Sequence, residues 1–481
     1  MNSSLFRTKS VKELIGETQE EGRRLKKTLR AWDLVAIGIG CIIGVGIFVL
    51  PGVEAADHAG PGIILSFAIA ALACACAALC YAELAAMLPV AGSAYTYGYA
   101  TLGEIFAWII GWDLVLEYML GASLVAIGWS SYFVNLADHL LAPFHYKVVT
   151  MIAGSPWSKV PGALNLPAVV IVAVITWLLV RGIKESARVN LTIVIVKVLV
   201  ILLFMGIAVW YINPSNWTPF APFGFSGILR AAGIVFLAYI GFDAVSTTAE
   251  EAVNPQRDMP IGILGSLVIA TVLYIGVAAI MTGVVPYKRL GVADPVALVL
   301  NVLHKPFASA MVSVGAIAGI TSVLLVLLMG QPRILFSMSR DRLLPPFLSK
   351  VHRRFKTPYI ATMLSGLIVG VTSAFTPIHI VAELVSIGTL FAFMIVCAGV
   401  LVLRYTEPER PRPFKAPLFP VIPAAGILLC GLLMFSLAED TWIRFVVWLI
   451  IGLLIYGFYG YRNSRRESSR GEEAVPGIIP D

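Results

Sequence analysis

The sequence predicts an all-α integral membrane protein with about twelve transmembrane helices. Of the 481 residues, 58% are apolar and only 13% are charged, and the mean hydropathy is +0.87. An ordinary globular chain is about half apolar and a quarter charged. Apolar stretches of helical length also recur along the chain, separated by Pro and Gly clusters. Lipid must therefore solvate much of the surface.

The apolar stretches are long enough to cross a bilayer as helices, which takes about 20 residues each. We expect twelve spans, at 33–52, 61–88, 103–134, 166–182, 188–211, 227–250, 261–285, 309–338, 358–376, 380–403, 418–437 and 441–461. The stretches 135–165 and 286–308 read as longer loops that hold short surface helices. Residues 1–32 are polar and show no signal peptide, so we expect the first span to direct insertion.

The distribution of basic residues predicts the topology. An even number of spans places both termini on one side, and that side then carries most of the 35 Lys and Arg residues. Cytoplasmic loops carry such an excess. We therefore expect the segment 1–32 and the tail 462–481 to be cytoplasmic, in a multi-pass protein of the cell membrane. The net charge of +7 reflects topology and does not indicate a nucleic-acid partner.

Cysteine and histidine patterns exclude several classes of site. The six cysteines all lie inside apolar spans, where they read as small packing residues. The six histidines fall in or near loops, and no zinc or hydrolase motif occurs. We expect no metal, no cofactor and no catalytic residues, so an enzyme is not predicted.

The first span contains sequence that is unfavourable for a helix. Its residues Gly38 to Phe48 include four glycines, at 38, 40, 44 and 46. Each glycine costs about 1 kcal/mol relative to Ala in an exposed helix interior. One interpretation is an unwound segment at bilayer depth, whose free peptide groups must face a cavity or a ligand. The alternative is close helix packing, for which glycine is also used.

The sixth span is interrupted at a matching place. Residues Phe236 to Asp243 carry Gly241 and an acidic residue in the middle of the span. Spans one and six occupy corresponding positions in two five-helix halves. Interrupted segments at matching positions are a strong sequence indication of the binding site of a transporter.

Helix ends supply the chemistry that such a site needs. The N–H groups of Gly44, Val45 and Gly46, where span one resumes, suit a carboxylate. Free carbonyl groups near the breaks suit an ammonium, and we expect these from Ile42, Phe236, Ala238, Tyr239 and Ile240. A site with both ends fits a zwitterion, the invariant part of an L-amino acid.

At these residues the sequence resembles the amino acid–polyamine–organocation superfamily, and within it the cationic amino acid transporter family of prokaryotic type. Single motifs are modest, but their order and spacing from about residue 30 to 410 are specific. The motifs are Gly38 to Phe48, Tyr81 to Leu84, Pro89 to Tyr95, Phe242-Asp243 with Glu250-Glu251, Asn254-Pro255, Pro260-Ile261, and Pro332-Arg333 through Met338 to Asp341.

The resemblance implies the leucine-transporter fold, with a five-plus-five inverted repeat followed by two helices. The repeats then cover 33–211 and 227–403, and the last two helices cover 418–461. In that fold, broken helices near the bilayer midplane form the substrate site. The resemblance also implies an aromatic lid on span six, at Phe236, which closes the outer path over the substrate.

One lysine lies in the middle of the fifth span. Intramembrane ionisable residues are functional candidates by default, and Lys197 is flanked by apolar residues on both sides. The resemblance implies that its ammonium replaces the sodium ion that related carriers hold between spans one and eight. We therefore expect proton coupling rather than sodium coupling. The alternative is a lysine that reaches the membrane surface.

Further acidic residues lie inside spans. Glu117 in the third span is a candidate for contact with the substrate or a proton, and the resemblance implies that an acidic residue is required there; the alternative is a structural hydrogen-bond partner. Asp113 lies one turn earlier. Asp243 is expected to cap the resumed helix or to take a proton. Glu83 and Glu383 are expected to support the structure or to line the inner gate.

The predicted lining for the substrate side chain is mostly apolar. We take it from spans three, six, eight and ten, as Leu120, Ser123, Ala238, Ile320, Ser322, Leu327 and Ile387. No acidic cluster is evident. This favours small or neutral amino acids at least as strongly as cationic ones.

The sequence thus predicts a secondary active transporter for an L-amino acid, coupled to protons, that works by alternating access. An exchanger of amino acids or polyamines is the first alternative, and a channel or a nutrient sensor is less favoured. The expected partners are the substrate, protons and the lipid bilayer. A bound sterol or other lipid and a small membrane-protein partner are left open.

Overall fold

The computed structural model describes residues 28–87, 95, 97–99, 102–141, 150–157, 162–182, 187–246, 248–292, 294–352, 354–355 and 357–463. Most of the predicted N-terminal segment, the tail from residue 464 and the motif residues 89–94 lie outside this part of the chain.

The described residues are almost entirely helical and form no strand, only two isolated β-bridges. The α-helices are α2 (Ala31–Ile42), α3 (Val45–Phe48), α4 (Leu50–Glu54), α5 (Ile63–Met87), α7 (Glu104–Leu141), α8 (Leu166–Arg181), α9 (Ala187–Ala208), α10 (Gly224–Val235), α11 (Phe242–Ser246), α12 (Pro255–Val284), α13 (Pro295–Val302), α14 (Pro306–Arg340), α15 (Tyr359–Phe375), α16 (Ile378–Thr406), α17 (Val421–Phe435) and α18 (Glu439–Ile455). Shorter turns join several of them, including the 3-10 segment η8 (Phe236–Tyr239).

Seven of these helical stretches are long and apolar enough to cross a membrane: Leu50–Met87, Glu104–Asp138, Leu191–Tyr211, Pro255–Val284, Pro306–Arg340, Ile378–Thr406 and Glu439–Asn463. Five shorter apolar helices accompany them: Ala31–Ile42, Leu166–Arg181, Gly224–Tyr239, Tyr359–Phe375 and Val421–Phe435. Each predicted span contains at least one described helix. The prediction of an all-α membrane protein is therefore confirmed.

Several helix boundaries differ from the prediction. Helix α7 continues past the predicted end at 134 to Leu141, because apolar and helix-favouring residues run on without a Pro or Gly. The stretch 286–308 was expected to hold a short helix, and α13 lies there with Pro295 in its first turn.

Small residues let the helices approach one another. A Cβ placed on Gly315 of α14 would lie 2.3 Å from Val200 of α9, and one on Gly319 would lie 2.8 Å from the stem of Lys197. Lipid tails are as apolar as leucine, so packing of this kind drives helices together inside a bilayer. The close contact of α9 with α14 brings Lys197 into the centre of the bundle.

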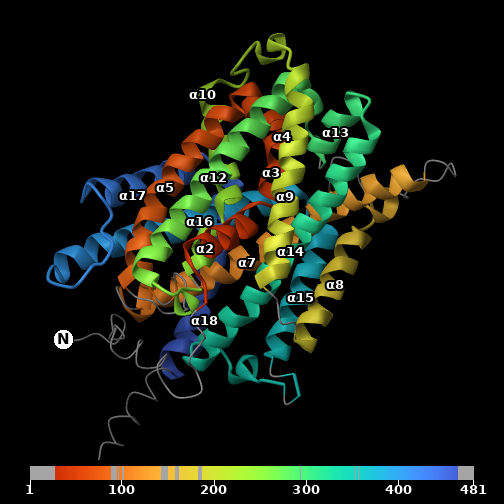
Figure 1. Ribbon diagram of the computed structural model, residues 1–481. Coiled ribbons are helices and arrows are strands. Elements are labelled where there is room, and N and C mark those ends of the chain that lie inside the picture. Colours follow the sequence, from red (N-terminus) through yellow and green to blue (C-terminus); the bar gives the residue numbers. More distant parts are fainter. Residues whose placement is uncertain are drawn as a thin grey trace, which may run out of the picture.

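The arrangement of the helices places the broken segments at the centre (Figure 1). Helices α2 and α3 lie among α5, α7, α12 and α14, whereas α8 and α15 run side by side along one edge of the bundle. Helix α17 packs on α16 and α5, and α18 packs on α16 and α7. The broken segments are therefore packed against several of the long helices.

Candidate functional site

The first helix break lies between α2 and α3. Helix α2 ends at Ile42, Ile43 is extended, and Gly44 adopts φ −155° and ψ −131°. After the break, the first hydrogen bonds within the helix are donated by the N–H groups of Ile47 and Phe48, and both go to the Gly44 carbonyl. The N–H groups of Val45 and Gly46 belong to the first turn, where a helix leaves its donors without internal acceptors.

The second break lies between α10 and α11. Helix α10 tightens into η8, Ile240 is extended, and Gly241 has φ +124°, a conformation that favours glycine. The Oδ1 atom of Asp243 accepts a hydrogen bond of 3.0 Å from the Gly241 N–H. The Asp243 side chain thus bonds to the backbone of the turn that precedes α11.

The two breaks lie directly against each other. A Cβ on Gly241 would lie 2.8 Å from the Cys41 carbonyl carbon and 2.9 Å from the Ile42 nitrogen. A Cβ on Gly46 would lie 2.6 Å from the Ala238 Cβ. Both glycines thus permit backbone contact that any side chain would prevent. Sequence reasoning placed the breaks correctly, and the structure adds that they touch.

A tyrosine from α12 joins the two breaks. The Tyr274 hydroxyl lies 2.8 Å from the Ile42 carbonyl oxygen and 2.7 Å from the Ala238 carbonyl oxygen. Because a hydroxyl has a single proton, it donates to one carbonyl at a time. Each carbonyl oxygen has two lone pairs, so both retain capacity for an ammonium. No sequence signal marked Tyr274, since it lies in an ordinary apolar helix.

A small cavity of about 60 Å³ lies beside the breaks. Of the predicted site residues, it is lined by Ile42, Gly44, Val45, Gly46, Ala238, Ile240, Gly241, Asp243, Glu117 and Leu327. The lining that was not predicted is Cys41, Tyr118, Gly121, Leu124, Val125, Leu237, Val323, Val326 and Val385. The missed residues are mostly valine and leucine on α7, α14 and α16, and nothing in the sequence distinguishes them from residues that pack elsewhere.

Lys197 of α9 contacts the first break. The side chain is fully buried, and its Nζ atom donates to the carbonyl oxygens of Gly40 at 2.7 Å and Ile43 at 3.0 Å. Its stem packs on Gly319 of α14. The Lys197 side chain thus lies between α2, which belongs to predicted span one, and α14, which belongs to predicted span eight. It does not reach the surface.

Two buried carboxyl groups follow each other on α7. Glu117 lines the cavity, and one of its oxygens has no hydrogen-bond partner among the described residues. Neither oxygen of Asp113, one turn away, has a partner within that part of the chain. A Cβ on Gly388 of α16 would lie 2.8 Å from an Asp113 oxygen. Asp113 therefore faces α16, and Glu117 is not held as a structural partner through that oxygen.

Several predicted residues lie away from the cavity. The Phe236 ring packs against Phe393 of α16, with ring centroids 5.5 Å apart, and its neighbour Leu237 is the residue that lines the cavity. The Tyr239 hydroxyl donates to the Phe67 carbonyl. Periodicity along a helix cannot assign which residue of a 3-10 turn faces inward, because the turn rotates successive side chains further than an α-helix does.

The remaining pocket predictions also lie outside the lining. The Ser123 hydroxyl donates to the Met119 carbonyl within its own helix, and the Ser322 hydroxyl donates to Gly319. Neither these serines nor Leu120, Ile320 and Ile387 line the cavity. A serine bonded to its own helix costs little in an apolar span, so its presence there did not indicate a ligand.

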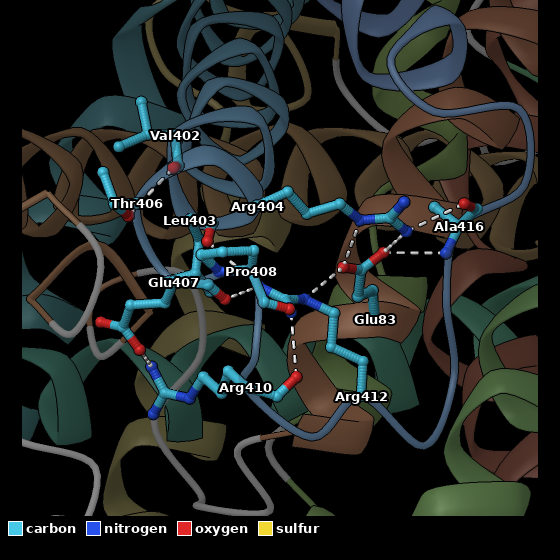
Figure 2. Close-up of polar contacts among 10 residues, drawn as sticks. All are labelled: Glu83, Val402, Leu403, Arg404, Thr406, Glu407, Pro408, Arg410, Arg412 and Ala416. Carbon is cyan, nitrogen blue, oxygen red and sulfur yellow. Dashed lines mark hydrogen bonds and ion pairs between the residues drawn. The ribbon is translucent and has the colours of Figure 1, made fainter.

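Ionic contacts around Glu83 of α5 join this helix to the end of α16 and to the segment that follows α16 (Figure 2). The buried carboxylate accepts from Arg404 of α16, with Nε 2.9 Å away, and from the Ala416 N–H at 2.8 Å. The Nε atom of Arg412 lies 3.4 Å from the same carboxylate. The Arg412 guanidinium also donates to the Leu403 and Glu407 carbonyls at the end of α16.

The opposite end of α16 is held by Glu383. One of its oxygens lies 3.3 Å from Arg230 of α10, and the other accepts from the Thr441 hydroxyl of α18. Glu83 and Glu383 thus act at opposite ends of α16, so only one of them can line an inner gate. Each carboxylate joins α16 to a neighbouring element.

A second cavity of about 300 Å³ lies further along the same elements. It is lined by Asp57 beyond α4, by Ser131 of α7 and by His379 at the start of α16. The stripe of α7 that lines the first cavity at Leu124 continues to Ser131, two turns later. The two cavities therefore share one face of α7.

Comparison with known proteins gives consistent matches over nearly the whole chain. A family model described as amino acid permease matches residues 29–457. A branched-chain amino acid permease of Bacillus subtilis is 50% identical, over 97% of this chain and 99% of the relative. A methylthioribose transporter of the same organism is 46% identical, over 96% and 99%. Cationic amino acid transporter 1 of Arabidopsis thaliana is 32% identical, over 91% and 83%. These matches confirm the resemblance inferred from the motifs.

Proposed function

Because the chain belongs to the amino acid permease family, we propose that it moves an L-amino acid across the cell membrane by alternating access, coupled to protons. The observation that carries the proposal is the meeting of two helix breaks at one cavity. Free peptide groups at bilayer depth are tolerated only where they face protein, water or a ligand. In the proposed topology twelve helices cross the membrane in a five-plus-five inverted repeat plus two, and both termini are cytoplasmic.

The proposed substrate site holds the zwitterion by backbone groups. The N–H groups of Gly44, Val45 and Gly46 bind the carboxylate at the start of the resumed helix. The carbonyls of Ile42, Ala238 and Ile240, all in the cavity lining, bind the ammonium. Binding at the first two requires the Tyr274 hydroxyl to share or release one carbonyl.

The lining of the cavity favours an uncharged aliphatic side chain on the substrate. Val323, Val326 and Leu327 from α14, Val385 from α16 and Val125 from α7 all line the space. Apolar contact of this kind binds branched side chains. It offers a long cationic side chain two carboxyl groups, those of Glu117 and Asp243, and Asp243 already accepts from the Gly241 N–H. Relatives named as branched-chain amino acid permeases support this choice.

Proton coupling is proposed to run through Lys197. Its ammonium bonds to the carbonyls of Gly40, in the last turn of α2, and of Ile43, at the first break. Loss of the proton removes the charge that both carbonyls stabilise, so the break is held less firmly when Lys197 is neutral. Protonation of Lys197 is thereby linked to the geometry of the substrate site. Phe236, packed on Phe393, remains the predicted aromatic gate.

The test is uptake into proteoliposomes that contain the purified protein. Labelled leucine, isoleucine, valine, alanine, lysine and arginine are compared, with and without an inward proton gradient, and methylthioribose is added as a competitor. We expect the proton gradient to raise the concentration of branched-chain amino acids inside the liposomes above their concentration outside. Uptake that occurs only against preloaded substrate would indicate an exchanger. Binding without flux of any amino acid would refute the proposal.

A further inference from the structure

A long apolar groove runs along the edge of the bundle between α8 and α15, the two helices that lie side by side in Figure 1. Its volume is about 1010 Å³, at the top of the range of about 300–1,000 Å³ for small-molecule sites. The lining is aliphatic over most of its length, with Val169, Val172, Leu364, Leu367 and Val371 as examples. Within the described chain, no charged residue lines the groove.

Glycine gives the groove its depth on the α15 side. A Cβ on Gly366 would lie 2.2 Å from the Thr176 hydroxyl, so this glycine allows α8 and α15 to touch. One turn later, a Cβ on Gly370 would meet only Val172, at 3.9 Å. Space at Gly370 is therefore open, where a larger residue would fill it.

A cation lies at one end of the groove. Trp177 belongs to the lining, and the Arg181 guanidinium lies 4.0 Å from the centre of its ring. Arg181 is exposed, and it makes no ion pair with any residue that the structure describes. The loop with Arg354 and Phe355 lies against Gly182, the residue after Arg181. A Cβ built on Gly182 would lie 3.4 Å from the Phe355 carbonyl oxygen. An aromatic ring and an arginine at one end of an apolar surface are typical of the membrane interface.

We propose that this groove binds one phospholipid with an anionic headgroup. The acyl chains lie along α8 and α15, and the headgroup phosphate pairs with Arg181. Helix α8 rises about 24 Å over its length, which exceeds the roughly 15 Å of one leaflet of hydrocarbon. Arg181 lies on the predicted cytoplasmic side, where anionic lipids are concentrated. The site is separate from the substrate cavity and does not depend on the proposed transport.

The charge of the headgroup follows from the exposed guanidinium. A zwitterionic lipid brings its own cation next to its phosphate, so it offers Arg181 little net attraction. An anionic lipid supplies a counter-charge in a region of low dielectric constant, where a charged pair is stronger than in water. We therefore expect discrimination by headgroup at Arg181 and affinity for acyl chains along Gly370.

Thermal unfolding of the delipidated protein in detergent tests the proposal. Dioleoyl phosphatidylglycerol and dioleoyl phosphatidylcholine are titrated separately, because a ligand of the native state raises Tm with its concentration. We expect phosphatidylglycerol to raise Tm more than phosphatidylcholine. R181Q should remove the difference, and R181K should retain most of it. R444Q is the matched control, because Arg444 is also exposed but lies on α18 and pairs with Asp440.

The second variant tests the groove itself. In Gly370→Leu the added side chain occupies the space of the acyl chains, so both lipids should raise Tm less than in the wild type. Native mass spectrometry of the wild type and R181Q gives the bound lipid directly, and it does not require Gly370→Leu to fold. Equal Tm shifts from the two lipids, or equal behaviour of R181Q and R444Q, would overturn the proposal. A dimer that Gly370→Leu abolishes would show that a second copy occupies the groove instead.

Discussion

Gly46→Ala is the most direct test of the contact between the two helix breaks. Gly46 lies in the first turn of α3, and an added Cβ would lie 2.6 Å from the Ala238 Cβ and 2.8 Å from the Ala238 Cα. Ordinary carbon contact begins at 3.4 Å. The nearest atoms are backbone or are attached directly to it, so no side-chain rotation can make room.

The cost of the substitution follows from that overlap. The two breaks must move apart by about 0.6–0.8 Å to reach ordinary contact. Overpacking of this kind costs about 1–3 kcal/mol. If the cost applies only to the closed arrangement, the population of that state falls by about 5–150-fold relative to open states. Each carbonyl and N–H group around the substrate also shifts from its position.

Initial uptake of labelled leucine into proteoliposomes measures the effect. We expect Gly46→Ala to lower the rate at least about fivefold, from the smaller of these estimates. Gly206→Ala is the control, because Gly206 lies on α9 and a Cβ there meets nothing within 4 Å. It should transport normally, and α9 should gain up to about 1 kcal/mol of helix propensity. Wild-type rate and affinity in Gly46→Ala would refute the argument that contact between the breaks shapes the site.

Three further predictions concern two residues at the helix breaks and the ion pairs at one end of α16. Lys197→Ala should abolish proton-driven uptake and retain some substrate binding, measured by scintillation proximity with and without a pH gradient; full sodium-independent uptake would contradict the coupling role. Tyr274→Phe removes the hydroxyl that bridges Ile42 and Ala238, at a cost of about 0.5–1.5 kcal/mol per hydrogen bond, and should lower both Tm and leucine uptake. An unchanged Tm and rate would show that the bridge is dispensable. Glu83→Gln leaves buried guanidinium groups without a carboxylate, and loss of one partner of a buried pair costs about 3–5 kcal/mol. Its Tm should fall well below that of the control Glu407→Gln. The Glu407 carboxylate of the wild type is 52% exposed, and its pairing with Arg410 is worth at most about 1 kcal/mol. Equal Tm values for the two variants would contradict the structural role of Glu83.

The sequence predicted the helices and their breaks because both have a local cause. Apolar runs of helical length mark each span, and glycines at 38, 40, 44 and 46 mark the first interruption. The structure places that interruption at Ile43 and Gly44, inside the predicted stretch. Gly241, which marked the second, adopts the positive φ that glycine permits. Lys197 was identified because a charge inside an apolar span has few structural explanations.

The lining of the cavity could not be predicted in the same way. Leu327 was expected and lines the space, but Val323, one turn earlier, does so too and was missed. Valine and leucine occur throughout α14, and only the angle of that helix against α7 and α16 decides which of them face inward. Tyr274 illustrates the same limit, since its hydroxyl reaches two carbonyls that are distant in sequence. Long-range contacts of this kind have no local signature.

The ion pairs at the two ends of α16 differ in how far they are buried. At one end Arg404 is only 14% exposed and Glu83 is 2% exposed, whereas at the other end Arg230 is 40% exposed to its surroundings. Salt screens the second pair far more than the first. In the proposed alternating access, we therefore expect the Glu383 end of α16 to move further than the Glu83 end. High ionic strength should therefore favour opening at the Glu383 end of α16 and have little effect at the Glu83 end.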